Sequence, residues 1–166
     1  MFLSSKRLLF KQITLLIASL FFPKRIHAKS SFWHTIALVQ QDLFPDTQGV
    51  PTLHNIHAKR YLKGVMHDVR VGHEEKDFIR NGEQWLHEAS QKQYRKNYTD
   101  LKPLQRQKIL RDISKERWGE RWIEILLTYI MEALLCDPVY GGNSAEVGWK
   151  WLHHTPGLPR PKKALI

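Results

Sequence analysis

Histidines are the residues of this 166-residue chain that could most readily hold a metal or transfer a proton, and there are nine of them. His54 and His57 are three positions apart, which would place both imidazoles on one helix face, and His153 and His154 form a doublet. A zinc site needs further Cys, His, Asp or Glu ligands at short spacing, and neither pair has them. Solvated or core-edge histidines are the favoured interpretation, and no metal site is predicted.

Nucleophilic and cofactor-binding motifs are also absent from the sequence. It contains no GxSxG, no P-loop, no GxGxxG and no CxxCH, the motifs of hydrolysis, phosphate binding, dinucleotide binding and covalent haem attachment. The carboxylates occur where helix surfaces would place them in any case. We therefore predict that this chain contributes no catalytic residue and binds no cofactor of its own.

Cys136 is the single cysteine, so the chain cannot form an internal disulfide. A buried thiol is the favoured interpretation, because Leu134 and Leu135 precede it and an unpaired cysteine often serves as a small core residue. An intermolecular disulfide is the alternative, since an odd cysteine in an exported protein can pair with another chain.

The segment that follows is rich in proline, glycine and tryptophan. Pro138 would end the preceding helix, and the two glycines at 141 and 142 permit positive φ and close backbone approach. Asn143 with Glu146 resembles the capping pair of a short helix. The segment therefore predicts a turn that leads into one more helical turn.

Two tryptophans and a proline-rich run complete the C-terminal region. Trp149 and Trp151 are two positions apart and cannot share a helix face, so one should pack inward and the other should be free for a partner. Residues 155–161 have few backbone donors and favour an extended, preformed arm. The arm could wrap its own bundle or bind a partner. Because aromatic and arginine side chains are enriched at interfaces, partner binding is slightly favoured.

The sequence of this C-terminal region resembles that of the gluconate 2-dehydrogenase subunit 3 family. The resemblance is strongest in DPxYGGN, continues through GWK and closes with PGxP, and weaker similarity extends upstream through LFP at 43–45 and the helix from Leu101. The residues that carry the resemblance, and that we expect to bind a partner, are Asp137, Pro138, Tyr140, Gly141, Gly142, Asn143, Gly148, Trp149, Lys150, Pro156, Gly157 and Pro159.

The resemblance implies an accessory subunit without a redox centre of its own. Its partner would be a large FAD-containing flavoprotein of the glucose-methanol-choline oxidoreductase family, often joined by a multihaem cytochrome c subunit that carries haem c. The family's small subunit typically helps the flavoprotein to mature and be exported, and membrane association would come only through the complex. The alternative function is an independent exported helical domain that binds an acidic ligand or polymer.

The elements that must position these residues are expected to be helices. No stretch alternates cleanly enough to be a strand, so we predict an all-α fold, a compact bundle of about five helices with an extended Pro/Gly/Trp-rich C-terminal arm. The periodicity predicts helices over residues 32–43, from a Thr52 cap to Gly72, over 74–98, from an Asp100 cap through Pro103, and over 120–135. Gly82 should weaken the third helix by about 1 kcal/mol relative to alanine, and the helix could bend there.

The helix predicted over 120–135 is apolar on most of its faces. One narrow polar strip interrupts it, formed by residues four positions apart: Glu120, Glu124, Thr128 and Glu132. A helix so nearly apolar all round is central in its bundle or covered by another chain.

Residues 1–28 have the pattern of an export signal. Lys6, Arg7 and Lys11 form a basic region before the apolar run at 13–22, which is shorter than the roughly 20 residues that span a bilayer. The pair Lys6-Arg7 stands where a twin-arginine signal has two arginines, so the signal is Tat-like with KR in place of RR, and a Sec signal is the alternative route of export. We expect a periplasmic protein in which residues 29–166 form a single helical domain.

The charge argues against a nucleic-acid partner. Of the 26 Lys and Arg residues, five lie in residues 1–28, which leaves 21 against 16 acidic residues, a net charge of +5 for 29–166. The nearest approach to a basic cluster, Lys92, Arg95 and Lys96, is expected to be an exposed helix face. A moderate excess of this kind suits an acidic partner, whereas a nucleic-acid site would show clustered Lys and Arg.

Overall fold

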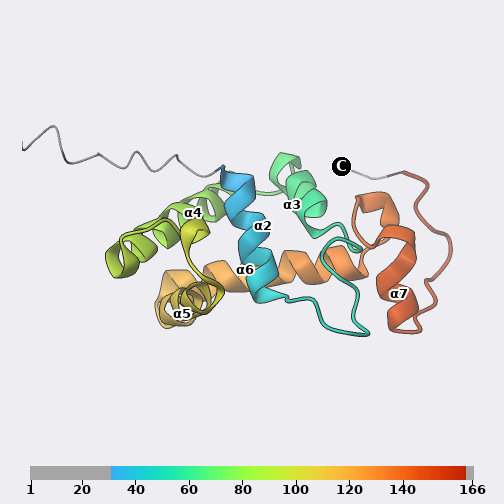
Figure 1. Cartoon of the computed structure of the whole chain (residues 1–166). Helices are drawn as coiled ribbons and strands as arrows, with labels where there is room; N and C mark the ends of the chain where they lie inside the picture. The colour runs from blue at the N-terminus through green and yellow to red at the C-terminus, as the bar shows by residue number, and fades with distance from the viewer. Residues whose placement is uncertain (1–30, 164–166) are drawn as a thin grey trace, which may run out of the picture.

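The computed structural model describes residues 31–163, and every regular element in this range is helical (Figure 1). The α-helices of the described residues are α2 (Phe32–Leu43), α3 (Ala58–His67), α4 (His73–Tyr94), α5 (Pro103–Ile113), α6 (Arg117–Leu135) and α7 (Val147–Trp151). Short 3-10 helices are η1 (Tyr98–Asp100), η2 (Pro138–Tyr140) and η3 (Ser144–Glu146). The predicted all-α fold is confirmed, while the expected export signal lies outside the described residues.

A membrane-spanning helix is not found in the described range, because no helix between residues 31 and 163 combines the length and the hydropathy that crossing a bilayer needs. The helices instead bury their apolar stripes against one another.

The first helix, α2, forms at the residues that the periodicity predicts. Ile36 and Val39 are completely buried, one helical turn apart on the face that meets the core. The helix ends where the N–H of Phe44 donates to the carbonyl of Gln40, and Pro45 directly afterwards cannot continue the ladder.

The second helix, α3, is shorter than expected. The hydroxyl of Thr52 donates to Oδ1 of Asn55 at 2.6 Å, and the N–H of Asn55 donates back to the Thr52 hydroxyl. These bonds close a turn instead of capping a helix, so α3 begins only at Ala58 and ends at His67. The predicted Thr52 cap and the predicted end at Gly72 are therefore wrong.

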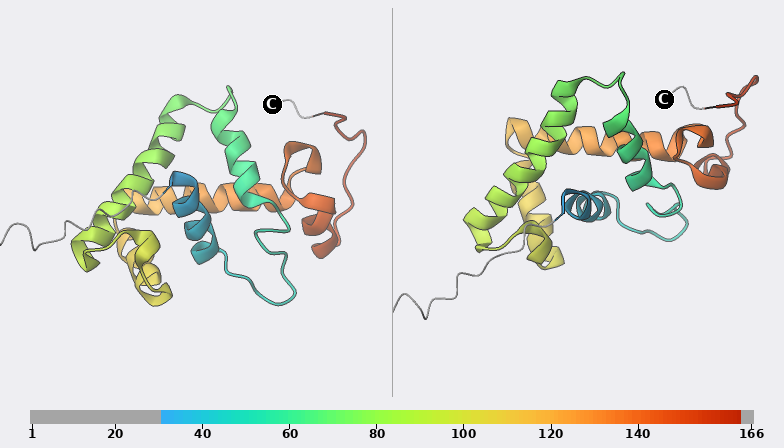
Figure 2. Two further views of the ribbon diagram at one scale, coloured as in Figure 1. Left: turned by 45° about the horizontal axis from the view of Figure 1, so that its top comes forward. Right: turned by 90° about the horizontal axis from the view of Figure 1, so that it is seen from above.

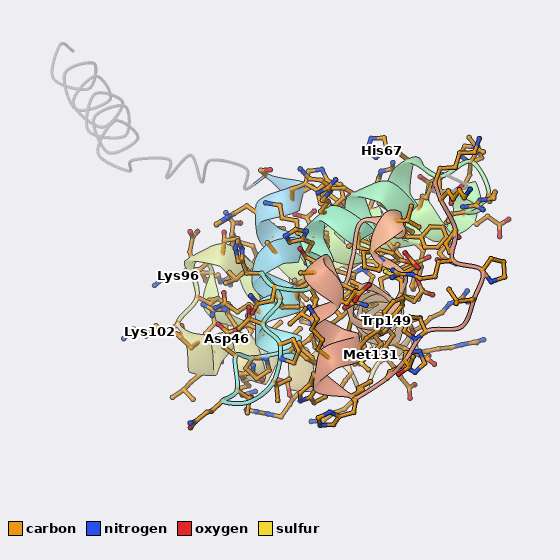
Figure 3. All side chains as sticks on the ribbon, turned by 90° about the vertical axis from the view of Figure 1, so that its right-hand side faces the viewer. Asp46, His67, Lys96, Lys102, Met131 and Trp149 are labelled. Carbon is orange, nitrogen blue, oxygen red and sulfur yellow. The ribbon has the colours of Figure 1, made fainter. Side chains whose placement is uncertain are left out.

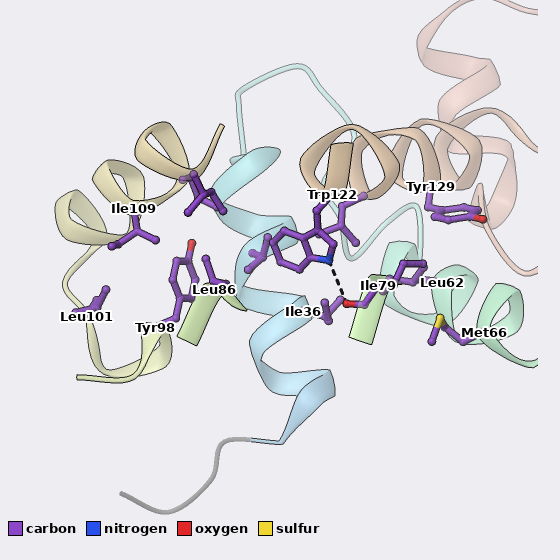
Figure 4. Packing of buried hydrophobic residues seen from close by; sticks show 14 residues of the cluster. Ile36, Leu62, Met66, Ile79, Leu86, Tyr98, Leu101, Ile109, Trp122 and Tyr129 are labelled. Atoms are coloured by element: carbon purple, nitrogen blue, oxygen red, sulfur yellow. Dashed lines mark hydrogen bonds between the residues drawn. The ribbon is translucent and has the colours of Figure 1, made fainter. Parts of the chain in front are cut away.

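The third helix, α4, continues as one helix through Gly82. Gly82 is buried, and a Cβ at this position would overlap the indole ring of Trp122 on α6. Trp122 is fully buried and donates its Nε1–H to the carbonyl of Ile79 at 3.1 Å (Figure 4). Gly82, where the helix was expected to be weak, is thus the position at which α4 and α6 approach each other closely. The helix ends at Tyr94 because Arg95 adopts a left-handed φ of 56°.

The connection from α4 to α5 also differs from the expectation. Asp100 does not cap α5 but closes the η1 turn, in which Tyr98 is completely buried. The predicted Asp100 cap is wrong: Lys102 is the N-cap and Pro103 the first helical residue of α5, where the missing N–H of proline has no helical partner to lose.

The central element is α6, which contacts α2, α3, α4, α5 and α7 and passes through the middle of the described molecule (Figures 1 and 2). It begins at Arg117, slightly before the predicted start, and ends at Leu135 as predicted. Its buried residues are Gly119, Trp122, Leu126, Tyr129, Ile130, Ala133 and Leu134. Of the two expected alternatives, central in its bundle or covered by another chain, the central place is the one that these contacts show.

Two clusters of buried apolar side chains share α6. The larger cluster joins α6 to the other long helices, and ten of its residues are labelled in Figure 4: Ile36, Leu62, Met66, Ile79, Leu86, Tyr98, Leu101, Ile109, Trp122 and Tyr129. The smaller cluster lies toward the C-terminal end of α6 and contains Ile56, Ala58, Ile130, Ala133 and Leu134. The single helix α6 therefore links both parts of the core.

A largely buried ion pair ties α2 to α5. Arg106 donates to the two carboxylate oxygens of Asp42 at 2.6 and 3.0 Å, and the hydroxyl of Tyr98 donates to Asp42 at 2.7 Å. Burial, followed by the hydrogen bond to Asp42, raises the pKa of Tyr98, and the hydrogen bond to Asp42 raises the pKa of Arg106. Both donors keep their protons at neutral pH, so the contact is a structural clamp.

Candidate partner-binding surface

The motif at 137–143 closes the C-terminal end of α6. The last carbonyls of a helix have no partner inside the helix. Here the backbone N–H of Asn143 donates to the carbonyl of Ala133 at 2.6 Å, and its side-chain amide donates to the carbonyl of Cys136 at 2.9 Å. The Asn143 side-chain oxygen in turn accepts from the N–H of Gly148 at 2.7 Å. Asn143 is completely buried and is the centre of this cap.

Two glycines, Gly142 just before Asn143 and Gly148 five residues after it, allow the chain to pass close to α6. A Cβ on Gly142 would lie 2.6 Å from the carbonyl oxygen of Ala133, and one on Gly148 would overlap the carbonyl of Leu134. With hydrogen at these positions, η3 and α7 can pack directly on the helix end. The motif therefore needs glycine at these two positions for the packing of this chain itself.

Trp149 covers the same helix end from the outside. It is 7% exposed and donates its Nε1–H to the carbonyl of Leu135 at 2.7 Å. Trp151, two positions further, is 40% exposed. The prediction that one tryptophan packs inward while the other stays accessible is confirmed.

The C-terminal residues turn back onto the motif through Arg160. Its guanidinium donates to Asp137 at 3.0 Å and to Glu146 at 2.6 Å, and its centre lies 5.0 Å from the ring centroid of Trp149. One positive charge is thereby shared between two carboxylates, and it lies beside an aromatic face in a cation–π arrangement. The arm was expected either to wrap its own bundle or to bind a partner. This contact fits the first alternative.

The residues that were expected to bind a partner differ in exposure. Those that are buried in the chain's own fold are Gly142, Asn143, Gly148 and Trp149. Those that are partly buried are Asp137, Pro138, Tyr140, Gly141 and Pro156. The exposed residues are Lys150, Gly157 and Pro159. The structure brings the motif together around one helix end, and partner contact by these residues stays a prediction.

Cys136 is the residue that follows α6, and its side chain is partly buried with no disulfide in the described chain. Burial raises the pKa of its thiol. At neutral pH the group is a thiol and not a thiolate, so its intrinsic nucleophilicity is low. This fits the favoured interpretation of a partly covered thiol, and pairing with another chain stays a prediction.

A groove of about 730 Å³ runs along the face of α6 that the other helices leave uncovered. Its floor is an apolar row with four-residue spacing: Ile123, Leu127, Met131 and Leu135. Its edges carry the polar strip noted in the sequence together with residues from three other positions: Glu120, Glu124, Thr128, Glu132, Tyr61, Ser114 and Cys136. Met131 and Leu135 are 42% and 40% exposed, which is unusual for large apolar side chains on a central helix.

One edge of the groove is anchored by Tyr61 of α3. Its hydroxyl donates to Glu132 at 3.1 Å, and burial together with the Glu132 charge raises its pKa. Further along α6, the Tyr129 hydroxyl donates to Glu75 of α4 in the same way, and burial is again the main cause of its raised pKa. Both phenols stay protonated at physiological pH and act as donors that hold α3 and α4 against α6.

A metal-binding constellation is not found in residues 31–163. No group of three or more His, Cys, Asp or Glu side chains within that range could hold a metal ion. The rings of His54 and His57 lie edge to face with centroids 6.3 Å apart, and the ring of His154 lies against Trp149. These histidines therefore act in local packing.

The groove residues Ile123, Leu127, Met131 and Leu135 were not among the predicted partner-binding residues. The sequence did contain a pattern that points to them. It is an almost wholly apolar helix with one acidic strip, which was expected to be either central or covered by another chain. The structure makes it central and also leaves one apolar row uncovered.

Fold and surface together define a small all-α protein whose C-terminal motif closes a central helix and whose main apolar groove lies along that helix. The family model described as gluconate 2-dehydrogenase subunit 3 matches residues 30–157. The chain therefore belongs to the gluconate 2-dehydrogenase subunit 3 family, a family of accessory subunits of multi-subunit dehydrogenases. Neither a curated protein nor a solved structure matches the chain.

Proposed function

We propose that this chain is the non-catalytic small subunit of a periplasmic, flavin-dependent gluconate or sugar dehydrogenase complex. It would assist the maturation, export or stability of the large FAD subunit, a flavoprotein of the glucose-methanol-choline family. A multihaem cytochrome c would be the third member and would take the electrons onward. Membrane association would come only through these partners.

The observation that carries this proposal is the family match over residues 30–157, which covers every helix of the described residues. Two further features support it. The basic and apolar pattern of residues 1–28 fits an export signal, and an apolar row on α6 that is exposed at Met131 and Leu135 fits a protein that works in a complex.

The proposal is tested by co-expressing the tagged full chain with a large flavoprotein of the glucose-methanol-choline family from the same genome. We expect both proteins to co-purify with the absorbance of bound flavin, and the complex to reduce an artificial electron acceptor with gluconate or glucose. The chain expressed alone should show no such activity. Sugar oxidation by the chain alone, or a chain that stays separate from the flavoprotein, would contradict the proposal.

The second candidate is an independent domain that binds an acidic ligand or polymer, and one local feature favours it. A hollow of about 480 Å³ around the start of α3 is lined by cationic and titratable side chains: His54, His57, Lys59, Arg60 and Lys63, together with Leu53. Tight, salt-sensitive binding of heparin or polyphosphate to the isolated chain, without binding to the flavoprotein, would favour this candidate.

A further inference from the structure

We propose that the groove along α6 is the surface on which the large subunit docks, and that its occupant is an amphipathic helix with an apolar face and Lys or Arg along its edges. This inference rests on the proposed function and deepens it, because it places the contact on α6 and not on the C-terminal motif.

The apolar row on α6 has the spacing and length that receive a helix. Ile123, Leu127, Met131 and Leu135 follow one another at four-residue steps, which aligns them in one ridge along the helix. At about 1.5 Å per residue the row is roughly 18 Å long, about three helical turns. A helix of similar length could lay its own apolar stripe into this groove.

The charges at the edge of the groove select a basic occupant. The groove lining contains Glu120, Glu124 and Glu132 but no Lys, Arg or His, although residues 29–166 carry 21 basic against 16 acidic residues. Within the described chain, Glu120 and Glu124 form no ion pair or side-chain hydrogen bond. An acidic edge on a basic protein leaves carboxylates that cations of a partner can pair with.

A second copy of this chain is a poor occupant for the same reason. If two α6 helices packed face to face in antiparallel orientation, each would set its acidic strip against the acidic strip of the other, and like charges brought together across an interface are strongly unfavourable. A chemically different partner avoids this repulsion. The charge pattern therefore favours a hetero-complex over a homodimer.

The C-terminal motif gives the groove a fixed end. Leu135 and Cys136 line the groove, and the carbonyls of the same two residues accept hydrogen bonds from Trp149 and Asn143. Figure 3 views the molecule from this end and labels Met131 and Trp149. The buried motif thus holds the last turn of α6 in place, so it can serve docking without touching the partner.

The test uses the complex of the full chain with its co-expressed flavoprotein. The double variant Met131→Gln/Leu135→Gln removes apolar contact at two exposed groove positions, and Glu124→Lys reverses one edge charge. The matched controls are Val69→Gln/Leu104→Gln, at positions 95% and 84% exposed outside the groove, and Glu88→Lys on the surface of α4. The dissociation constant is measured by mass photometry after dilution, and circular dichroism checks that each variant is folded.

We expect the groove double variant to weaken the complex at least about thirtyfold, and Glu124→Lys to weaken it about fivefold or more. The controls should stay within about twofold of the parent chain. If the parent complex forms and the groove variants bind as well as their controls, the inference is overturned while the proposed function stands. If the parent chain forms no complex, both fall. A homodimer of the chain that the groove variants dissociate would overturn the inference in favour of a second copy.

Discussion

At the scale of single residues, Gln40 of α2 shows a polar group that the fold does not use. Its side chain is 1% exposed, and within the described residues its Nε2 has no hydrogen-bond partner. A buried donor without a partner costs about 1–3 kcal/mol. Methionine has a similar volume and no donor, so Gln40→Met should raise the free energy of unfolding by about 1 kcal/mol, measured by urea denaturation.

The neighbouring residue supplies the control for this prediction. Gln41 lies on the same helix but is exposed, so Gln41→Met should change the unfolding free energy by less than about 0.5 kcal/mol. A Gln40→Met variant that is less stable than the parent would mean that the amide has a partner that the described residues do not include.

Asn143 differs from Gln40, because both the nitrogen and the oxygen of its side-chain amide form hydrogen bonds. Asn143→Ala would remove the bond to the Cys136 carbonyl and leave the N–H of Gly148 unpaired in a buried place. Alanine also tolerates the left-handed φ of 41° less well than asparagine. We expect a loss of about 3 kcal/mol in unfolding free energy.

Two comparison variants separate the parts of this effect. Asn143→Asp keeps the oxygen that accepts from Gly148 but replaces the donor with a charged oxygen that faces the Cys136 carbonyl in a buried place, so its loss at neutral pH should be at least as large. Asn81→Ala, at an exposed position on α4, should have little effect. If Asn143→Ala unfolds at the same urea concentration as the parent, the cap does not stabilise α6.

At the scale of elements, the contact of α4 with α6 decides whether replacing Gly82 raises or lowers the stability of the protein. Gly82→Ala should gain about 1 kcal/mol from helix propensity, but the added Cβ would overlap the buried Trp122 ring, which is held by its bond to Ile79. Overpacking in a core costs about 1–3 kcal/mol, so a net loss of stability is expected. Gly64 of α3 is the control, because a Cβ there meets nothing within 4 Å and Gly64→Ala should be stabilising. Thermal unfolding of both variants checks the opposite signs.

The C-terminal arm is held to its turn by a carboxylate whose ionisation depends on pH. The hydrogen bond from Arg160 lowers the pKa of Asp137 below its usual 3.8. A carboxylate with a lowered pKa stabilises the folded contact above its unfolded pKa, and this contribution is lost as the pH falls through the folded value. Arg160 also donates to Glu146, so the expected event is the loss of its contact with Asp137, which should be intact at pH 5 and detach as the pH falls below about 3.8.

The Arg160 side-chain Nε–H signal in NMR follows this detachment directly. In the Asp137→Asn variant the same signal should already be shifted at pH 7, because the charged acceptor is missing. A signal that stays constant from pH 6 to pH 2.5 would contradict the assigned contact.

At the scale of the whole molecule, the sequence predicted what depends on periodicity and composition. The all-α class, the bounds of α2 and the central place of α6 follow from apolar spacing, which is a local property. The start of α3 and the end of α4 could not be predicted, because a Thr52–Asn55 turn and a left-handed Arg95 compete with the helical pattern. Local preferences at such positions are too evenly balanced to decide a boundary.

The candidate site was predicted in part for a related reason. The residues of the C-terminal motif were identified as a unit, and the structure brings them together. Their burial could not be read from residue types, since glycine, asparagine and tryptophan occur both in helix caps and at interfaces. The groove needed the fold, because only the packing of α2 to α5 shows which face of α6 they leave open.

The whole described molecule should unfold as one unit because both parts of its core depend on α6. Leu126 belongs to the larger cluster and Ile130 to the smaller one, and both are fully buried. Leu126→Ala and Ile130→Ala should each cost about 2–5 kcal/mol. In a two-state protein, each loss shifts the entire transition, so circular dichroism and tryptophan fluorescence should report the same midpoint in both variants. If circular dichroism and tryptophan fluorescence gave different midpoints in Ile130→Ala, the two clusters would be separate folding units and α6 would not be the common core.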